Sequence, residues 1–84
     1  MTYKISILRK AQKQLAKIPA GDYKKIKQAI LGLAQDPRPS GAEKLKGRQG
    51  WRIRQGNYRV IYEIQDEQLI IIVLDVGNRK DIYR

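Results

Sequence analysis

The feature that most constrains the fold is an apolar run near the carboxyl end of the chain, Leu69-Ile70-Ile71-Ile72-Val73-Leu74, which no polar residue interrupts. The run is rich in β-branched side chains, a composition that favours a strand. A strand without polar positions is expected to be covered on both faces, as strands in the interior of a sheet are. The sequence therefore predicts a sheet in which this segment is a central strand.

Two earlier segments are expected to extend this sheet. The predicted strands are Trp51–Gln55, Tyr58–Gln65 and residues 68–76. The turn sequences Gly56-Asn57 and Asp66-Glu67 separate them, and short turns of this kind join neighbouring antiparallel strands. The sequence thus predicts a three-stranded meander in the second half of the chain.

A short strand and two amphipathic helices are predicted ahead of the meander. Residues 3–7 alternate between apolar and polar side chains, the two-residue period of a strand. Apolar residues then recur at spacings of three and four over residues 8–18, which Pro19 ends, and again over residues 23–33. Asp22 is placed to cap the second helix, and Asp36-Pro37 stops it.

The order of these elements predicts the fold class. Residues 36–50 carry several prolines and glycines without a sustained period, which indicates a loop between helices and meander. The order β-α-α-β-β-β predicts an α+β fold, with a helical hairpin packed on one face of a small antiparallel sheet. The 84 residues, 42% of them hydrophobic, are expected to form one domain, residues 1–84, with a thin core.

The residue types that are missing limit the chemistry. The chain contains no histidine and no cysteine, so disulfides, the usual transition-metal ligands and a histidine acid or base are absent. Catalysis would use Lys, Arg, Tyr or carboxylates, and we expect no cofactor and no metal. No apolar run long enough for a signal peptide or a membrane span follows Met1, which predicts a cytoplasmic protein without membrane contact.

Positive charge is large and concentrated. The 18 Lys and Arg residues against 8 Asp and Glu give a charge of +10, which nucleic acid or an acidic protein partner would neutralise. Residues 38–59 hold seven basic residues and one acid, Glu43, a net charge of +6. The basic residues are Arg38, Lys44, Lys46, Arg48, Arg52, Arg54 and Arg59. The alternative explanation is a solvated loop beside an edge strand that charge protects from aggregation.

The predicted hairpin places several of these arginines on one face. A two-residue turn at Gly56-Asn57 sets Arg54 directly opposite Arg59, and Arg52 then shares their face. Like charges paired across strands are unfavourable by up to ~1 kcal/mol, so a sequence shaped by stability alone would avoid the pair. Three guanidinium groups on one sheet face would form a fixed array for phosphate oxygens.

The same register divides the apolar residues of the meander between two faces. Facing the helices are Trp51, Ile53, Val60 and Tyr62, and beside the arginines are Ile61, Ile70, Ile72 and Leu74. An exposed apolar patch of the second kind is usually occupied by a partner. The alternatives are that the carboxyl-terminal segment or a second copy of the chain covers it.

Four fragments in this order resemble the RelE branch of the RelE/ParE toxin superfamily. The fragments are Lys44-Leu45-Lys46-Gly47, Trp51-Arg52-Ile53-Arg54, Gly56-Asn57-Tyr58-Arg59-Val60-Ile61-Tyr62 and Val76-Gly77-Asn78-Arg79-Lys80-Asp81-Ile82-Tyr83-Arg84. The resemblance implies a fold like that of small microbial ribonucleases and a toxin that cleaves messenger RNA in the ribosomal decoding site. The implied partners are an acidic antitoxin, in a hetero-oligomeric complex, and the ribosome with its messenger RNA.

The resemblance also assigns roles to individual residues. Arg52 and Arg54 match basic positions, often lysines, that hold the phosphate and assist proton transfer. Arg59 matches the arginine of a Gly-x-Tyr-Arg motif that contacts the scissile phosphate. Arg79 matches the arginine after Val-Gly-x, and Tyr83 the tyrosine near the carboxyl end, for which packing on the sheet is the alternative role.

Three further basic residues of the resembling region, Lys44, Lys46 and Arg48, are assigned to RNA contacts. Cleavage through the 2′-hydroxyl needs a base, charge stabilisation on the phosphorane and an acid at the leaving oxygen. Arginine stays protonated and serves best as the electrostatic stabiliser, while a ribosome that holds the substrate in line supplies positioning. Two alternative functions remain open: a ParE-type inhibitor of DNA gyrase, and a non-catalytic module that binds RNA or the ribosome.

Overall fold

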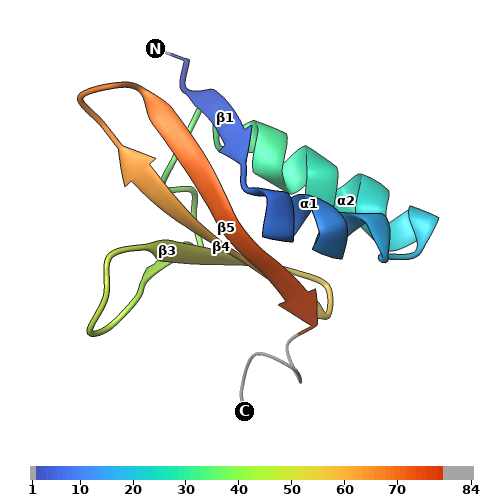
Figure 1. Cartoon of the computed structure of the whole chain (residues 1–84). Helices are drawn as coiled ribbons and strands as arrows, with labels where there is room; N and C mark the ends of the chain where they lie inside the picture. The colour runs from blue at the N-terminus through green and yellow to red at the C-terminus, as the bar shows by residue number, and fades with distance from the viewer. Residues whose placement is uncertain (1, 79–84) are drawn as a thin grey trace.

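The computed structural model describes residues 2–78, which form two layers, a five-stranded sheet and a pair of helices on one of its faces (Figure 1). The elements in chain order are β1 (Lys4–Ile7), α1 (Arg9–Ala16), α2 (Ala20–Gly32), β2 (Glu43–Lys44), β3 (Trp51–Gln55), β4 (Tyr58–Gln65) and β5 (Ile70–Asn78). The predicted α+β class, with a helical hairpin on one face of the sheet, is confirmed.

The sheet has the strand order β1-β5-β4-β3-β2. β5, which contains the apolar run from Ile70 onward, has a strand on each side, as predicted for an interior strand. Every neighbouring pair is antiparallel except β1 and β5, which run parallel with Ile5 opposite Ile71. The sheet is therefore mixed, whereas the sequence predicted antiparallel pairing throughout.

The hairpin between β3 and β4 has the predicted register. Gly56 adopts a φ of 61°, a value that glycine takes without steric cost at the first central position of such a turn. Arg54 pairs with Arg59, and Ile53 pairs with Val60 on the opposite face of the sheet. The turn chemistry thus fixes which side chains lie on each side of these strands.

Three local details differ from the sequence prediction. α2 begins at Ala20, so Asp22 lies in its first turn and makes no cap, because Pro19 already holds the backbone at the N-cap position. The loop after β4 contains four residues rather than two, since Gln65 pairs with Ile70 and Leu69 takes a positive φ of 56°. The two-residue strand β2 was not predicted.

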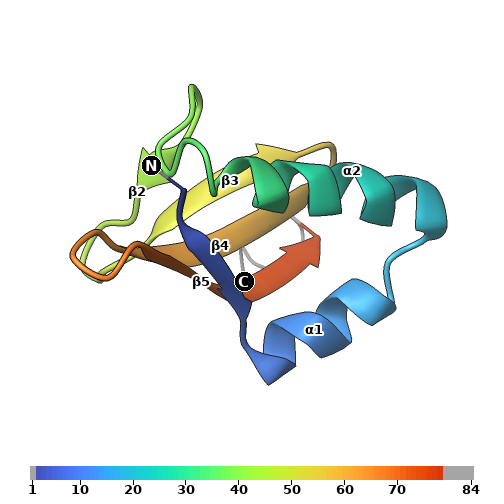
Figure 2. The same ribbon diagram turned by 90° about the horizontal axis from the view of Figure 1, so that it is seen from above.

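The core lies between the helices and one face of the sheet. α1 packs against β5 and α2 against β3 (Figure 2). The buried residues are Ala11, Leu15, Ile26, Ile30 and Leu33 from the helical half, and Ile53, Val60, Tyr62, Ile71, Val73 and Val76 from the sheet. Burial raises the pKa of the Tyr62 phenol to about 12, and its hydroxyl donates a 2.7 Å hydrogen bond to the carbonyl of Pro37. Across residues 2–78, no helix has the length and apolar character needed to cross a membrane.

Candidate functional site

Three arginines come together on the sheet face that the helices leave uncovered. Arg52 and Arg54 extend from β3 and Arg59 from β4, each one residue out of phase with the core positions Ile53 and Val60. Arg54 and Arg59 are direct cross-strand partners. The predicted grouping of these three residues is therefore what the fold produces, and we call Arg52, Arg54 and Arg59 the arginine cluster.

Arg59 is the buried member of the cluster. Only 3% of its surface is exposed, and it lies in the ladder between Arg54 on β3 and Gly77 on β5. Burying a guanidinium is expensive in desolvation energy, and a neighbouring guanidinium adds repulsion. A buried arginine directly opposite a second arginine is therefore an unusual feature of this sheet face.

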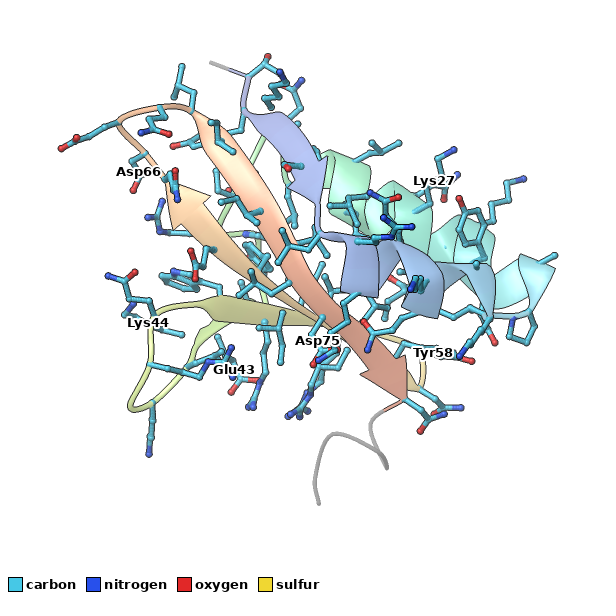
Figure 3. All side chains as sticks on the ribbon, viewed as in Figure 1. Lys27, Glu43, Lys44, Tyr58, Asp66 and Asp75 are labelled. Carbon is cyan, nitrogen blue, oxygen red and sulfur yellow. The ribbon has the colours of Figure 1, made fainter. Side chains whose placement is uncertain are left out.

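Glu43 connects the other two members. Its Oε2 atom lies 3.0 Å from Nη2 of Arg52, and its Oε1 atom lies 3.7 Å from Nη2 of Arg54. The hydrogen bond from Arg52, with the charge of Arg52 next and smaller effects of Arg54 and Arg59, holds the pKa of Glu43 below its usual range. Figure 3 shows Glu43 beside the sheet, far from the helical lysine Lys27.

Lys44 lies apart from the arginine cluster. It pairs with Trp51, whereas its neighbour Glu43 pairs with Arg52, so the two side chains leave β2 on opposite faces. The ammonium of Lys44 lies 5.6 Å from the centre of the Trp51 ring, and the guanidinium carbon of Arg38 lies 5.3 Å from it. Among the three residues assigned to RNA contacts, Lys44 thus belongs to a different surface.

Lys46 and Arg48 are exposed in the loop between β2 and β3. Arg48 lines a cleft of about 680 Å³ together with Ile61 and Asp75 of the sheet and Lys10 of α1. This cleft reaches the face that carries the arginine cluster, because Ile61 pairs with Arg52. Arg48 therefore lines a cleft that adjoins the face of the arginine cluster.

The two remaining predicted site residues, Arg79 and Tyr83, lie outside the described residues. They follow β5 in sequence, and the end of this strand is held by Gln14 of α1. The Gln14 amide donates a 2.6 Å hydrogen bond to Asp75 and accepts one of 2.8 Å from the backbone N–H of Val76. This contact could not be predicted from the sequence, because nothing in the helical period distinguishes Gln14 from a solvated polar residue.

Within residues 2–78, the apolar side chains expected to lie exposed beside the arginines are less exposed than predicted. Ile61 is buried at 7% exposure, and Ile70, Ile72 and Leu74 are partly buried. Arg52, which pairs with Ile61, is partly buried on the same face, and its guanidinium contacts Glu43. The expectation of a free isoleucine surface was therefore wrong for Ile61 and overstated for the others.

Residues 2–78 contain no group of three or more carboxylate, histidine or cysteine side chains that could hold a metal ion. On the face of the arginine cluster, three guanidinium groups lie together with one carboxylate, Glu43, next to them. Fixed cations of this kind are suited to binding a phosphate.

Comparison with known proteins agrees with this geometry. Residues 5–83 match the family described as the ParE toxin of the type II toxin-antitoxin system, parDE. The chain belongs to this toxin family. It is 30% identical over its whole length to the toxin RelG of Mycobacterium tuberculosis, covering 99% of that protein. The mRNA interferase toxin RelE of Escherichia coli is 26% identical over 95% of this chain and 86% of its own length.

The fold comparison gives the same result. The archaeal RelE-RelB complex from Pyrococcus horikoshii contains a chain that superposes with a TM-score of 0.84 at 29% identity, covering 94% of this chain and 97% of that one. The named relatives and this structure place the chain in the RelE-type branch of the superfamily.

Proposed function

We propose that this toxin is an endoribonuclease that cleaves messenger RNA on the ribosome, and that an acidic antitoxin neutralises it in a hetero-oligomeric complex. The observation that carries the proposal is the arginine cluster, in which Arg54 faces a buried Arg59 across two paired strands. A rigid strand pair holds these cations at fixed positions, as stabilisation of a charged transition state requires.

The roles of the residues follow from their chemistry. Arg59 stabilises the negative charge that develops on the phosphorane, and Arg52 and Arg54 bind the phosphate oxygens nearby. Arg79 and Tyr83 complete the catalytic residues. Tyr83 accepts the proton of the 2′-hydroxyl or orients this hydroxyl. Arg48 and Lys46 contact RNA beside the site, and Lys44 contacts it from the other face. The ribosome supplies the in-line arrangement that a small site without histidine supplies poorly.

The relatives support this choice of reaction and partner. The Escherichia coli relative is named an mRNA interferase, and the Pyrococcus structure is a complex of toxin and antitoxin. The charge of +10 fits a protein that binds both RNA and an acidic polypeptide in turn. The cytoplasm is the compartment that both partners imply.

Inhibition of DNA gyrase is the second candidate, because the family description is that of ParE toxins. Tyr83→Phe separates the two candidates, since it removes one hydroxyl and keeps the ring and the net charge. For a ribonuclease, cleavage on programmed ribosomes should fall by roughly 10²–10⁴-fold, the usual effect of losing a general acid or base. Thermal stability should stay unchanged.

The measurement is primer extension on messenger RNA bound to purified ribosomes, with a gyrase supercoiling assay run in parallel. Intact messenger RNA together with inhibited supercoiling, for both the parent and Tyr83→Phe, would show that gyrase is the target. Binding to ribosomes without either effect would leave only the non-catalytic RNA-binding function.

A further inference from the structure

Glu43 occupies the arginine cluster in a way that resembles a phosphate group. A phosphodiester carries one negative charge shared by two non-bridging oxygens, and so does an ionised carboxylate. The two oxygens of Glu43 are divided between two guanidinium groups, at 3.0 Å from Arg52 and 3.7 Å from Arg54. A phosphate bridging Arg52 and Arg54 would need the same positions.

We propose that Glu43 is an internal competitor of the RNA phosphate, which occupies Arg52 and Arg54 in the free toxin and is displaced when RNA binds. This inference deepens the proposed function, because it takes an RNA phosphodiester as the ligand of the cluster.

The surroundings of Glu43 make displacement possible. Its side chain is 50% exposed, and it belongs to β2, an edge strand of two residues. Ion pairs at such exposed sites are weak, since water and salt screen them. Arg52 is more confined, with 22% of its side chain exposed, so the acid is the partner that moves.

Charge explains why a competitor is useful here. Residues 38–59 carry a net charge of +6, and Glu43 is the one acid among them. Without it the cluster would bind any polyanion more tightly, including RNA that is not held for cleavage. Glu43 is displaced from the cluster only by a ligand that makes further contacts, such as RNA that also contacts Lys46 and Arg48 in the neighbouring loop.

The test compares two substitutions with the same change of charge. Glu43→Gln removes the competitor, and Glu67→Gln removes an exposed acid in the loop after β4, away from the cluster. Binding of a short fluorescent oligouridylate to the whole chain is measured by anisotropy at several KCl concentrations, without ribosomes. We expect Glu43→Gln to bind roughly threefold to fivefold more tightly than the parent, and Glu67→Gln to differ little. The slope of log K against log salt should stay nearly the same in all three proteins, because bound RNA contacts Arg52 and Arg54 in the parent as well as in Glu43→Gln.

Several results would overturn the inference. Equal tightening in both variants would mean that only net charge matters. Weaker binding in Glu43→Gln would mean that Glu43 orients the arginines for RNA. If neither the parent nor either variant bound oligouridylate, an RNA phosphate would not be the ligand of the arginine cluster. The binding assay contains no ribosome and is independent of cleavage. If the parent protein failed to cleave messenger RNA on ribosomes, the proposed function would be refuted, but tighter oligouridylate binding by Glu43→Gln would still support this inference.

Discussion

Two regions of this toxin carry the same net charge and use it differently. Residues 9–27, which contain α1 and the first part of α2, include seven basic residues and one acid, a net charge of +6, the same as residues 38–59. All seven basic residues of this helical region are exposed, and six of them are lysines. In the sheet region the charges include Arg59, buried at 3% exposure, and Arg54 directly opposite it.

The difference lies in how far the backbone fixes each charge. A helical lysine such as Lys27 projects from the helical layer, whereas the arginine cluster is held on two paired strands of the sheet (Figure 3). Lysine is a hydrated charge on a flexible stem, and arginine presents a planar fork that matches phosphate. If the proposed function is right, the helices contribute mainly to long-range attraction of RNA, and the sheet contributes a binding geometry.

The largest expected effect tests this comparison directly. Arg59→Ala and Lys24→Ala each remove one positive charge, the first from the cluster and the second from the exposed face of α2. We expect Arg59→Ala to lose a few hundred-fold in messenger-RNA cleavage, the effect of about 3 to 4 kcal/mol of lost transition-state stabilisation. Lys24→Ala should change the rate only slightly.

Single-turnover cleavage on programmed ribosomes provides the measurement, and circular dichroism serves as the control for folding of both variants. Equal losses in the two variants would end the distinction between the regions, because the toxin would then act as a diffuse phosphate binder.

The arginine cluster was predictable because local rules determine it. The turn Gly56-Asn57 sets the register of β3 against β4, and the two-residue period of strands then places Arg52, Arg54 and Arg59 on one face. The helical hairpin was equally accessible, since its apolar spacing has the period of a helix. These features depend on residues close together in the sequence.

The features that escaped prediction depend on distant parts of the chain. The parallel pairing of β1 with β5 joins segments more than sixty positions apart, and no local signal encodes its direction. β2 is two residues long, too short for any period, yet it decides that Glu43 meets Arg52 and that Lys44 lies on the other face. Glu43 stood out in the sequence as the one acid of its region, but its role needed that strand.

An intermediate effect separates stability from position. Tyr62→Phe keeps the buried ring on the core side of β4 and leaves the carbonyl of Pro37 without its 2.7 Å hydrogen bond. We expect a loss of about 1 kcal/mol in the free energy of unfolding, measured by urea denaturation. Cleavage below the unfolding temperature should stay the same, because the arginine register is unchanged. A parallel loss of cleavage would mean that the cluster depends on the tightness of the core.

The buried Tyr62 phenol should also make the stability of the fold depend on pH. Burial raises the pKa of Tyr62 from 10.0 to about 12, so the folded state favours the neutral phenol. Its contribution to stability is complete below pH 10 and is lost as the pH rises towards about 12, where the unfolded state has already released the proton. Tyr62→Phe should lack this alkaline loss. If the free energy of unfolding of the parent and of Tyr62→Phe fell in the same way at alkaline pH, the raised pKa of Tyr62 would be contradicted.

The smallest expected effect concerns the helical lysines alone. Lys27→Ala should weaken oligouridylate binding by at most about twofold at low salt, since it removes one screened charge that makes no fixed contact. At ~1 M salt the Debye length falls to about 3 Å, and the difference from the parent should disappear. Arg54→Ala, measured in the same anisotropy titration, should keep a defect at high salt because it removes a direct phosphate contact. A defect of Lys27→Ala that persists at high salt and equals that of Arg54→Ala would show that the helices hold a second RNA-binding surface, with geometry as specific as that of the sheet.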